Sequence, residues 1–189
     1  AIHSLEIGRT KYTSNAGLLP LRTEITNFVK RKYDLNYDPE DVLVTVGGSE
    51  AIDLAIRMLV EEGDEVISPE PCYVSYEPIT TLTGGVPVHI QCTEENEFRV
   101  TPEQIKEVLT EKTKMLILSY PNNPTGAVLR HEDLVGIAEV LKDTDVIVLS
   151  DEIYAELCYG DEEYESIAHI EGMYDRTIVV NGFSKSFSM

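Results

Sequence analysis

Hydrophobic and polar positions along the chain fall into two alternating patterns. Short apolar runs rich in valine and isoleucine have the length and composition of buried strands. Between them lie segments in which apolar residues recur at every third or fourth position, as in amphipathic helices. The predicted strands are Val42–Val46, Glu65–Ser68, Val86–Ile90, Met115–Ser119, Val146–Ser150 and Thr177–Val180. The predicted helices are Pro20–Tyr33, Ala51–Glu61, Ser75–Leu82, Pro102–Leu109 and Glu132–Leu141.

This alternation predicts a three-layer α/β/α fold with a mostly parallel sheet covered on both faces by helices. No internal repeat, low-complexity stretch or linker interrupts the pattern, so a single domain is expected over residues 1–189. One helix start is explicit, because Thr101 can cap a helix that begins at Pro102. Ligands of such sheets bind outside the carboxyl ends of the strands. We therefore expect residues with chemical roles just after the strands.

The formal net charge of −19 restricts the partners of the chain. A polyanion repels nucleic acid and anionic membranes, so neither is expected as a partner, and solubility is the simplest role of the charge. Cys72, Cys92 and Cys158 form neither a disulfide framework nor a metal-ligand pattern, which favours the reducing cytoplasm. The four histidines are scattered, and no metal site is expected.

Polar or aromatic residues follow the first two of these strands. Gly47, Gly48, Ser49 and Glu50 open a helix, where free amides and a hydroxyl suit a phosphate. Taken alone, Ser49 is better explained as an ordinary N-cap. The segment matches neither the dinucleotide fingerprint nor the Walker loop, so nucleotides are not indicated. Tyr73 could stack on a flat ring or could equally be a half-buried packing residue.

Three further segments follow the later strands. The loop Tyr120–Gly126 is dense in proline and asparagine, and Asn123 offers both a donor and an acceptor. Asp151 closes an apolar strand and needs donors or a cation, although it could instead cap a helix, and Tyr154 lies three residues on. Lys185 follows Thr177–Val180 between two serines, which suits a lysine that forms a Schiff base. The default for a single lysine is an exposed side chain.

The order of these elements resembles the aspartate aminotransferase superfamily, the class I and II aminotransferases among fold-type-I pyridoxal-phosphate enzymes. The resemblance rests on three stretches and runs through the whole chain in one register. The stretches are Pro121–Gly126, Ser150–Tyr154 and Asn181–Met189.

The resemblance implies a role for each candidate residue, with pyridoxal 5'-phosphate as the cofactor. Lys185 would form the Schiff base and carry the proton, and Asp151 would pair with the pyridine nitrogen. Asn123 and Tyr154 would hydrogen-bond the phenolic oxygen of the ring. Tyr73 would stack on the ring face, and Asn123-Pro124 would be a cis peptide. The phosphate ligands would be Gly48, Ser49, Glu50 and Ser184.

The resemblance also implies a homodimer, in which Tyr12 reaches the cofactor of the partner subunit. Many relatives carry a phosphate-binding serine three residues before the lysine, where this chain has Gly182. Relatives continue with arginines for the phosphate and the substrate carboxylate, in part from a C-terminal small domain. We therefore expect residues 1–189 to be a large cofactor domain without that small domain, and to be inactive alone.

The function expected of the intact protein is transfer of an amino group between an amino acid, aspartate-like or aromatic, and a 2-oxo acid. Two alternatives remain open at this point. One is a pyridoxal-phosphate-dependent C–S lyase or synthase on the same fold. The other is a catalytically inactive fragment or an acidic interaction module.

Overall fold

The computed structural model describes residues 2–159 and 164–189. The chain divides into two compact units, residues 1–45 and residues 46–189. The expectation of one cofactor domain over residues 1–189 stays a prediction.

The first unit is built around one long helix. Its elements are α1 (Ile2–Glu6), α2 (Leu19–Tyr33) and the 3-10 helix η1 (Pro39–Asp41). Helix α2 matches the predicted helix and starts one residue earlier. Arg22 is buried and donates from Nη1 to the carbonyl oxygen of Pro39 over 2.8 Å, which joins α2 to η1.

The predicted strand Val42–Val46 is wrong. These residues belong to no strand, and the amide of Val44 donates to the carbonyl oxygen of Ala16 over 3.0 Å. β-branched residues favour an extended chain, but a strand also needs a neighbouring strand as a partner. Gly17 fits this contact because an added Cβ would lie 2.7 Å from the Val44 Cβ.

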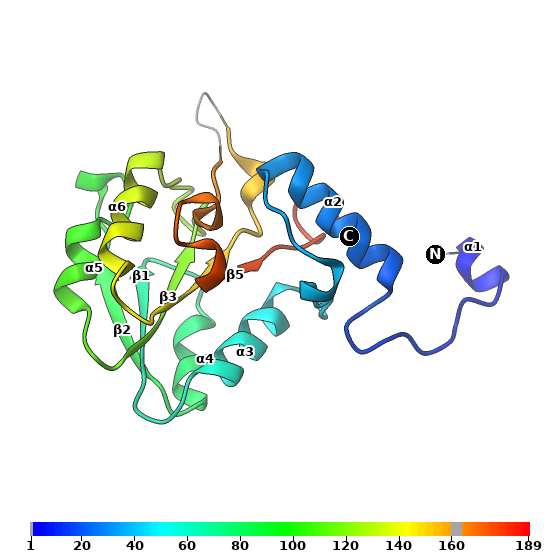
Figure 1. The fold of residues 1–189 in the computed structure, drawn as a ribbon, viewed down its shortest axis with the longest axis horizontal. Helices are drawn as coiled ribbons and strands as arrows, with labels where there is room; N and C mark the ends of the chain where they lie inside the picture. The colour runs from blue at the N-terminus through cyan, green and yellow to red at the C-terminus, as the bar shows by residue number, and fades with distance from the viewer. Residues whose placement is uncertain (1, 160–163) are drawn as a thin grey trace. The chain divides into compact units, whose positions relative to one another are not determined.

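The second unit contains a five-stranded, fully parallel sheet with the order β2-β1-β3-β4-β5 (Figure 1). The observed strands agree with the predicted ones to within two residues at each end. The strands are β1 (Glu65–Glu70), β2 (Val86–Gln91), β3 (Thr113–Ser119), β4 (Ile147–Asp151) and β5 (Thr177–Val180).

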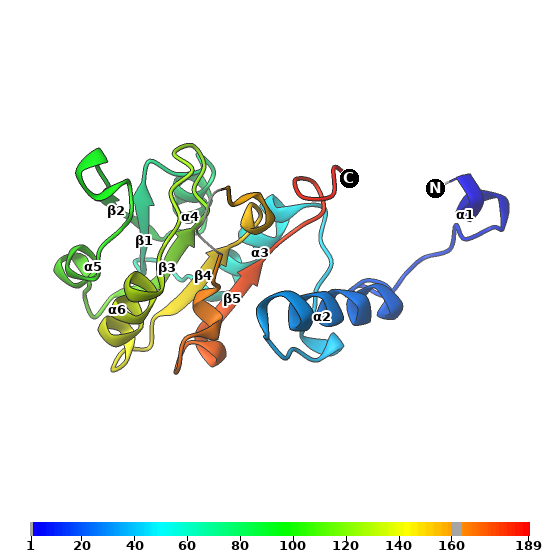
Figure 2. The ribbon, with the colours of Figure 1, turned by 90° about the horizontal axis from the view of Figure 1, so that it is seen from above.

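Helices cover both faces of this sheet (Figure 2). The helices are α3 (Gly48–Leu59), α4 (Tyr76–Leu82), α5 (Pro102–Val108) and α6 (His131–Leu141), with 3-10 helices η2 (Glu94–Asn96), η3 (Ala155–Leu157), η4 (Ile167–His169) and η5 (Tyr174–Arg176). Alternate residues of β3 enter different cores: Met115 and Ile117 pack with residues of α3 and α4. Leu116 and Leu118 pack with residues of α5 and α6. The predicted three-layer α/β/α fold is therefore confirmed.

The predicted cap of α5 is also confirmed. The Thr101 hydroxyl accepts from the Gln104 amide, and the Gln104 side chain accepts from the Thr101 amide, so each satisfies a backbone donor of the other. Every helix in residues 2–159 and 164–189 is too short or too polar to serve as a bilayer span.

Candidate functional site

The carboxyl ends of the parallel strands lie at one edge of the sheet. Ser119 at the end of β3 pairs with Asp151 at the end of β4, and Asp151 pairs with Val180 at the end of β5. The loops that carry Asn123, Tyr154 and Lys185 therefore begin side by side. This edge brings together the candidate residues of the second unit.

Asp151 is buried at this edge, with 5% of its surface exposed. Its Oδ2 accepts a hydrogen bond from the Tyr76 hydroxyl over 2.7 Å, and its Oδ1 accepts from the Ile153 amide over 3.2 Å. Burial raises the pKa of Asp151, and the two hydrogen bonds oppose that change. Within the part of the chain that the structure describes, both of its donors are neutral. The helix-cap alternative is wrong, because the next helix, η3, takes Tyr154 as its N-cap.

Tyr76 is a residue of the candidate site that the sequence does not single out. It is 1% exposed in the first turn of α4. From the sequence alone, a tyrosine at this position is expected to be a packing residue. Its spacing of three residues from Tyr73 is the signal that could have found it, because one helical turn places such residues on one side. The two rings meet edge to face with 5.6 Å between their centroids.

Helix α3 begins beside Tyr73. Its N-cap is Gly47 with a φ of 81°, so the reading of Ser49 as the cap is wrong. The hydroxyls of Ser49 and Tyr73 lie 3.1 Å apart, and this hydrogen bond lowers the pKa of Tyr73. The Glu50 carboxylate folds back and accepts from the Val46 amide. The first-turn amides of a helix lack acceptors within the helix, so this end can bind an anion.

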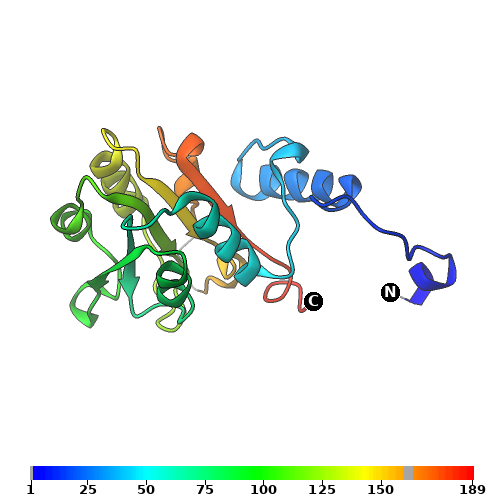
Figure 3. The ribbon, with the colours of Figure 1, turned by 90° about the horizontal axis from the view of Figure 1, so that it is seen from below.

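The side chain of Ile153 connects the start of α3 with the turn before Lys185. A Cβ added to Gly48 would lie 3.3 Å from Ile153 Cδ1, and one added to Gly182 would lie 2.7 Å from the same atom. Helix α3 also packs against β5, which leads into this turn (Figure 3). A serine at position 182 would require Ile153 to shift.

Lys185 lies against Tyr154, with its Nζ 5.5 Å from the centroid of the ring. This distance falls within the range of a cation–π contact. Lys185 and the neighbouring Ser184 are both exposed, whereas Tyr154 is half-buried. The structure thus brings Tyr154 and Lys185 together at the sheet edge.

The two asparagines of the loop after β3 have different positions. Asn122 is buried, donates to the carbonyl oxygen of Ser119 over 3.2 Å and accepts from the Thr125 hydroxyl over 2.9 Å. Asn123 is half-buried and takes no part in these loop bonds. The peptide bond between Asn123 and Pro124 is cis, as predicted.

Tyr12 belongs to the first unit, where its side chain is fully exposed. The other candidates all belong to the second unit. The role of Tyr12 in a partner's site stays a prediction.

Comparison with known proteins decides the family. Residues 3–189 match the family model for aminotransferase class I and II. The chain belongs to the class I and II aminotransferase family. Enzymes of this family use pyridoxal 5'-phosphate.

Individual aminotransferases support this assignment. The chain is 51% identical over 190 residues to YugH of Bacillus subtilis (strain 168), a protein provisionally named as an aminotransferase. It is 43% identical over 190 residues to an aspartate aminotransferase of Pyrococcus abyssi. Each match covers 100% of this chain and 49% of the relative. The crystal structure of an aromatic aminotransferase from Pyrococcus horikoshii OT3 superposes with a TM-score of 0.97 at 42% identity, over 100% of this chain and 50% of that one. The chain thus spans about half the length of the aminotransferases it matches.

Proposed function

We propose that the protein containing this chain is a pyridoxal-phosphate-dependent aminotransferase that transfers an amino group between an amino acid and a 2-oxo acid. The observation that carries the proposal is the position of Asp151. A buried carboxylate with two neutral donors lies at the same sheet edge as Lys185 and the first turn of α3. The family assignment supports the same reaction.

The residues at this edge fit the cofactor. A carboxylate without a cationic partner is unfavourable when buried, and a protonated pyridine nitrogen is such a partner. The first turn of the twelve-residue helix α3 suits the phosphate of the cofactor. Gly48 lets Ile153 pack close to this turn, because an added Cβ would lie 3.3 Å from Ile153 Cδ1.

When bound, the cofactor supplies an aldehyde that takes up an amino group and a cationic ring that withdraws electrons from the substrate α-carbon. Asp151 would pair with the ring nitrogen and favour its protonated form, and the Tyr76 hydroxyl, which donates to Asp151 Oδ2, would orient that carboxylate. Lys185 would hold the cofactor through its Nζ, and the same amine would move a proton at the substrate α-carbon. Tyr154, which lies against Lys185, positions that amine.

The remaining candidates would hold the cofactor. Tyr73 would cover one face of the ring, and the Ser49 hydroxyl, 3.1 Å from the Tyr73 hydroxyl, would bind the phosphate. Asn123 has an amide that the loop bonds leave available for the phenolic oxygen. Gly48 and Glu50 contribute backbone amides, and Ser184 a hydroxyl.

The substrate class and the assembly belong to the same proposal. The names of the relatives include aspartate and aromatic aminotransferases, which supports aspartate-like or aromatic substrates. A cytoplasmic homodimer in which Tyr12 serves the partner's site completes the proposal.

The test uses the full-length protein, since this chain spans half of its relatives. Purified protein with cofactor receives aspartate or phenylalanine, with or without 2-oxoglutarate, and the products are followed by chromatography. We expect glutamate to form only when the 2-oxo acid is present. Release of pyruvate and ammonia from a cysteine-type substrate, without an acceptor and without glutamate formation in the paired reaction, would identify a lyase instead.

A further inference from the structure

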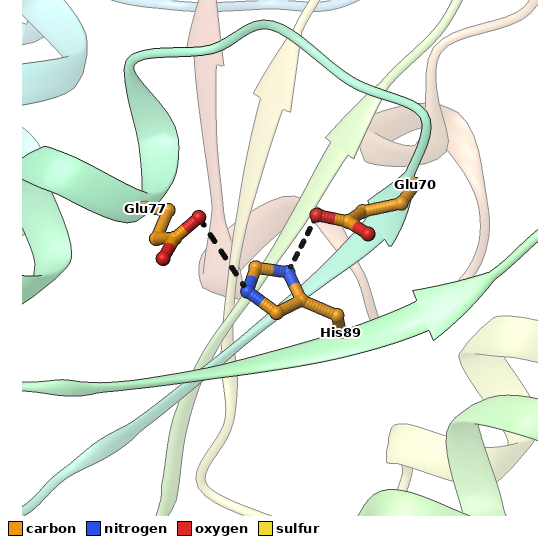
Figure 4. Close-up of side chains that lie close together, drawn as sticks. All are labelled: Glu70, Glu77 and His89. Atoms are coloured by element: carbon orange, nitrogen blue, oxygen red, sulfur yellow. Dashed lines mark ion pairs between the residues drawn. The ribbon is translucent and has the colours of Figure 1, made fainter.

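We propose that Glu70, Glu77 and His89 form a binding site for one divalent transition-metal ion of the zinc class. One ligand atom from each residue lies within 4.8 Å of the ligand atoms of the other two. Figure 4 shows the two carboxylates on either side of the imidazole ring. The site lies outside the residues assigned to the cofactor and is independent of the proposed function.

Three elements bring these residues together. Glu70 ends β1, and His89 lies on the neighbouring strand β2, opposite Ser68. Because residues two apart on a strand share a face, Glu70 and His89 lie diagonally on one face of the sheet. Helix α4 supplies Glu77 from its first turn. The sequence shows no ligand spacing, because each ligand comes from a different element.

Each ring nitrogen of His89 faces a carboxylate oxygen. Its Nδ1 lies 3.2 Å from Glu70 Oε1, and its Nε2 lies 3.9 Å from Glu77 Oε2. Ser68 Oγ lies 3.3 Å from Nδ1, and Gln91 Nε2 donates to Glu70 Oε2 over 2.5 Å. A metal ion beside Glu70 would take Nδ1 and leave Nε2 to a hydrogen-bonding partner such as water, which is the usual arrangement of metal-bound histidine.

The charge of the cluster suits a cation. Within residues 2–159 and 164–189, His89 is the one basic side chain at ion-pair distance from either carboxylate. A neutral imidazole, the form that binds metals, leaves two negative charges facing each other.

The donor set selects the metal. One imidazole nitrogen and two carboxylate oxygens are typical of zinc and its first-row neighbours, whereas magnesium prefers oxygen ligands alone. Two ligands of a tetrahedral zinc ion lie about 3.3 Å apart, so the Glu77 carboxylate must leave Nε2 and swing toward the ion on Nδ1. The side chain of Glu77 is 63% exposed and can make this movement, and water can complete the coordination.

Such an ion would connect the end of β1 to the first turn of α4. The segment between them carries Tyr73, and α4 itself begins with Tyr76. Metal binding would therefore restrain the segment that presents both tyrosines to the sheet edge.

The test titrates zinc(II) chloride into chelator-treated full-length protein in a calorimeter. The site variants are His89→Asn and Glu77→Gln, and the matched control is His169→Asn, an exposed histidine that lies 3.2 Å from Glu165. We expect one zinc ion per chain in the unsubstituted protein, binding weakened at least about tenfold in each site variant, and unchanged binding in the control. Magnesium chloride should give no saturable binding at the same concentrations.

Thermal unfolding provides a second readout. Zinc should raise the unfolding midpoint of the unsubstituted protein and of His169→Asn, because a ligand that binds only the folded state stabilises it. It should raise the midpoint of Glu77→Gln by less at the same zinc concentration, and the exposure of Glu77 keeps folding intact in that variant. No saturable zinc binding, or equal affinity in the site variants and the control, overturns the proposal and leaves His89 as an ion-pair residue only.

Discussion

At the scale of single residues, the hydroxyl of Tyr76 stabilises the ionised form of the Asp151 carboxylate against the effect of burial. It is the nearer of the two donors to the carboxylate, and both groups are buried. A hydrogen bond to a charged group contributes about 1.5–3 kcal/mol, and the cost is largest when the group left unpaired is buried. The tyrosine therefore favours the ionised carboxylate that the proposed chemistry requires.

Tyr76→Phe tests this role. Loss of the donor removes an interaction that lowers the pKa of Asp151, so the acid limb of the pH–rate profile should move to higher pH. The ratio kcat/KM should fall by about tenfold or more near neutral pH. Tyr73→Phe is the matched control. It removes a hydroxyl that bonds Ser49 and does not donate to Asp151, so the acid limb should stay in place. An unchanged acid limb in Tyr76→Phe would contradict the assigned role.

Glu152, next to Asp151, is a second buried carboxyl group with a different partner set. It is 0% exposed, and its Oε1 accepts from the Ser150 hydroxyl over 3.0 Å and from the Ser166 hydroxyl over 2.5 Å. Burial raises its pKa from 4.5 to about 7. The folded state thus binds this proton more tightly than the unfolded state, so its contribution to stability is full below pH 4.5 and is lost as the pH rises through about 7.

Glu152→Gln should remove this pH dependence. The glutamine keeps an acceptor for the two serines but does not ionise. Between about pH 5 and about pH 8, the substitution should abolish a decline in unfolding free energy on the order of 3 kcal/mol. Urea unfolding of both proteins at the two pH values measures the difference. Parallel pH dependence in the two proteins would show that Glu152 does not titrate in this range.

At the scale of elements, hydrophobic pattern and composition predicted the helices and strands correctly wherever local preference and tertiary packing favour the same structure. Strand β5 is observed with the predicted bounds, and the cap at Thr101 forms as expected. The segment Val42–Val46 has equally good β-forming residues but pairs with no strand among the described residues. Pairing depends on residues distant in sequence, so composition alone could not decide it.

The contact between α5 and α6 gives a prediction at this scale. A Cβ added to Gly136 in α6 would lie 2.5 Å from Cγ of Pro102, the first residue of α5. Alanine favours a helix by about 1 kcal/mol over glycine, but the rigid proline ring cannot move aside without shifting α5. Gly136→Ala should therefore lower the unfolding free energy by about 1–2 kcal/mol, measured by urea denaturation.

A double-mutant cycle isolates this contact. In a Pro102→Ala background the obstructing ring atom is absent, so Gly136→Ala should be neutral or stabilising there. An equal loss in both backgrounds would place the origin of the effect elsewhere.

At the scale of the whole molecule, the candidate site depends on strand order. The sequence identifies Asp151, Asn123 and Lys185 individually, because each follows an apolar strand. That β3, β4 and β5 are neighbours, and that their ends therefore meet, is visible only in the sheet. The contact of Tyr76 with Asp151 is likewise visible only in the structure, because it joins residues 75 positions apart. The Glu70, Glu77 and His89 cluster also depends on strand pairing.

The central claim is that the edge formed by these strands binds pyridoxal phosphate through Lys185. Its most direct test is reduction of the full-length protein with borohydride in the presence of the cofactor, followed by peptide mass mapping, with Lys185→Arg as the control. The account predicts a phosphopyridoxyl group on Lys185 and none on the corresponding peptide of the variant. A stoichiometric label on a different lysine, with Lys185 unmodified in folded protein, would contradict it.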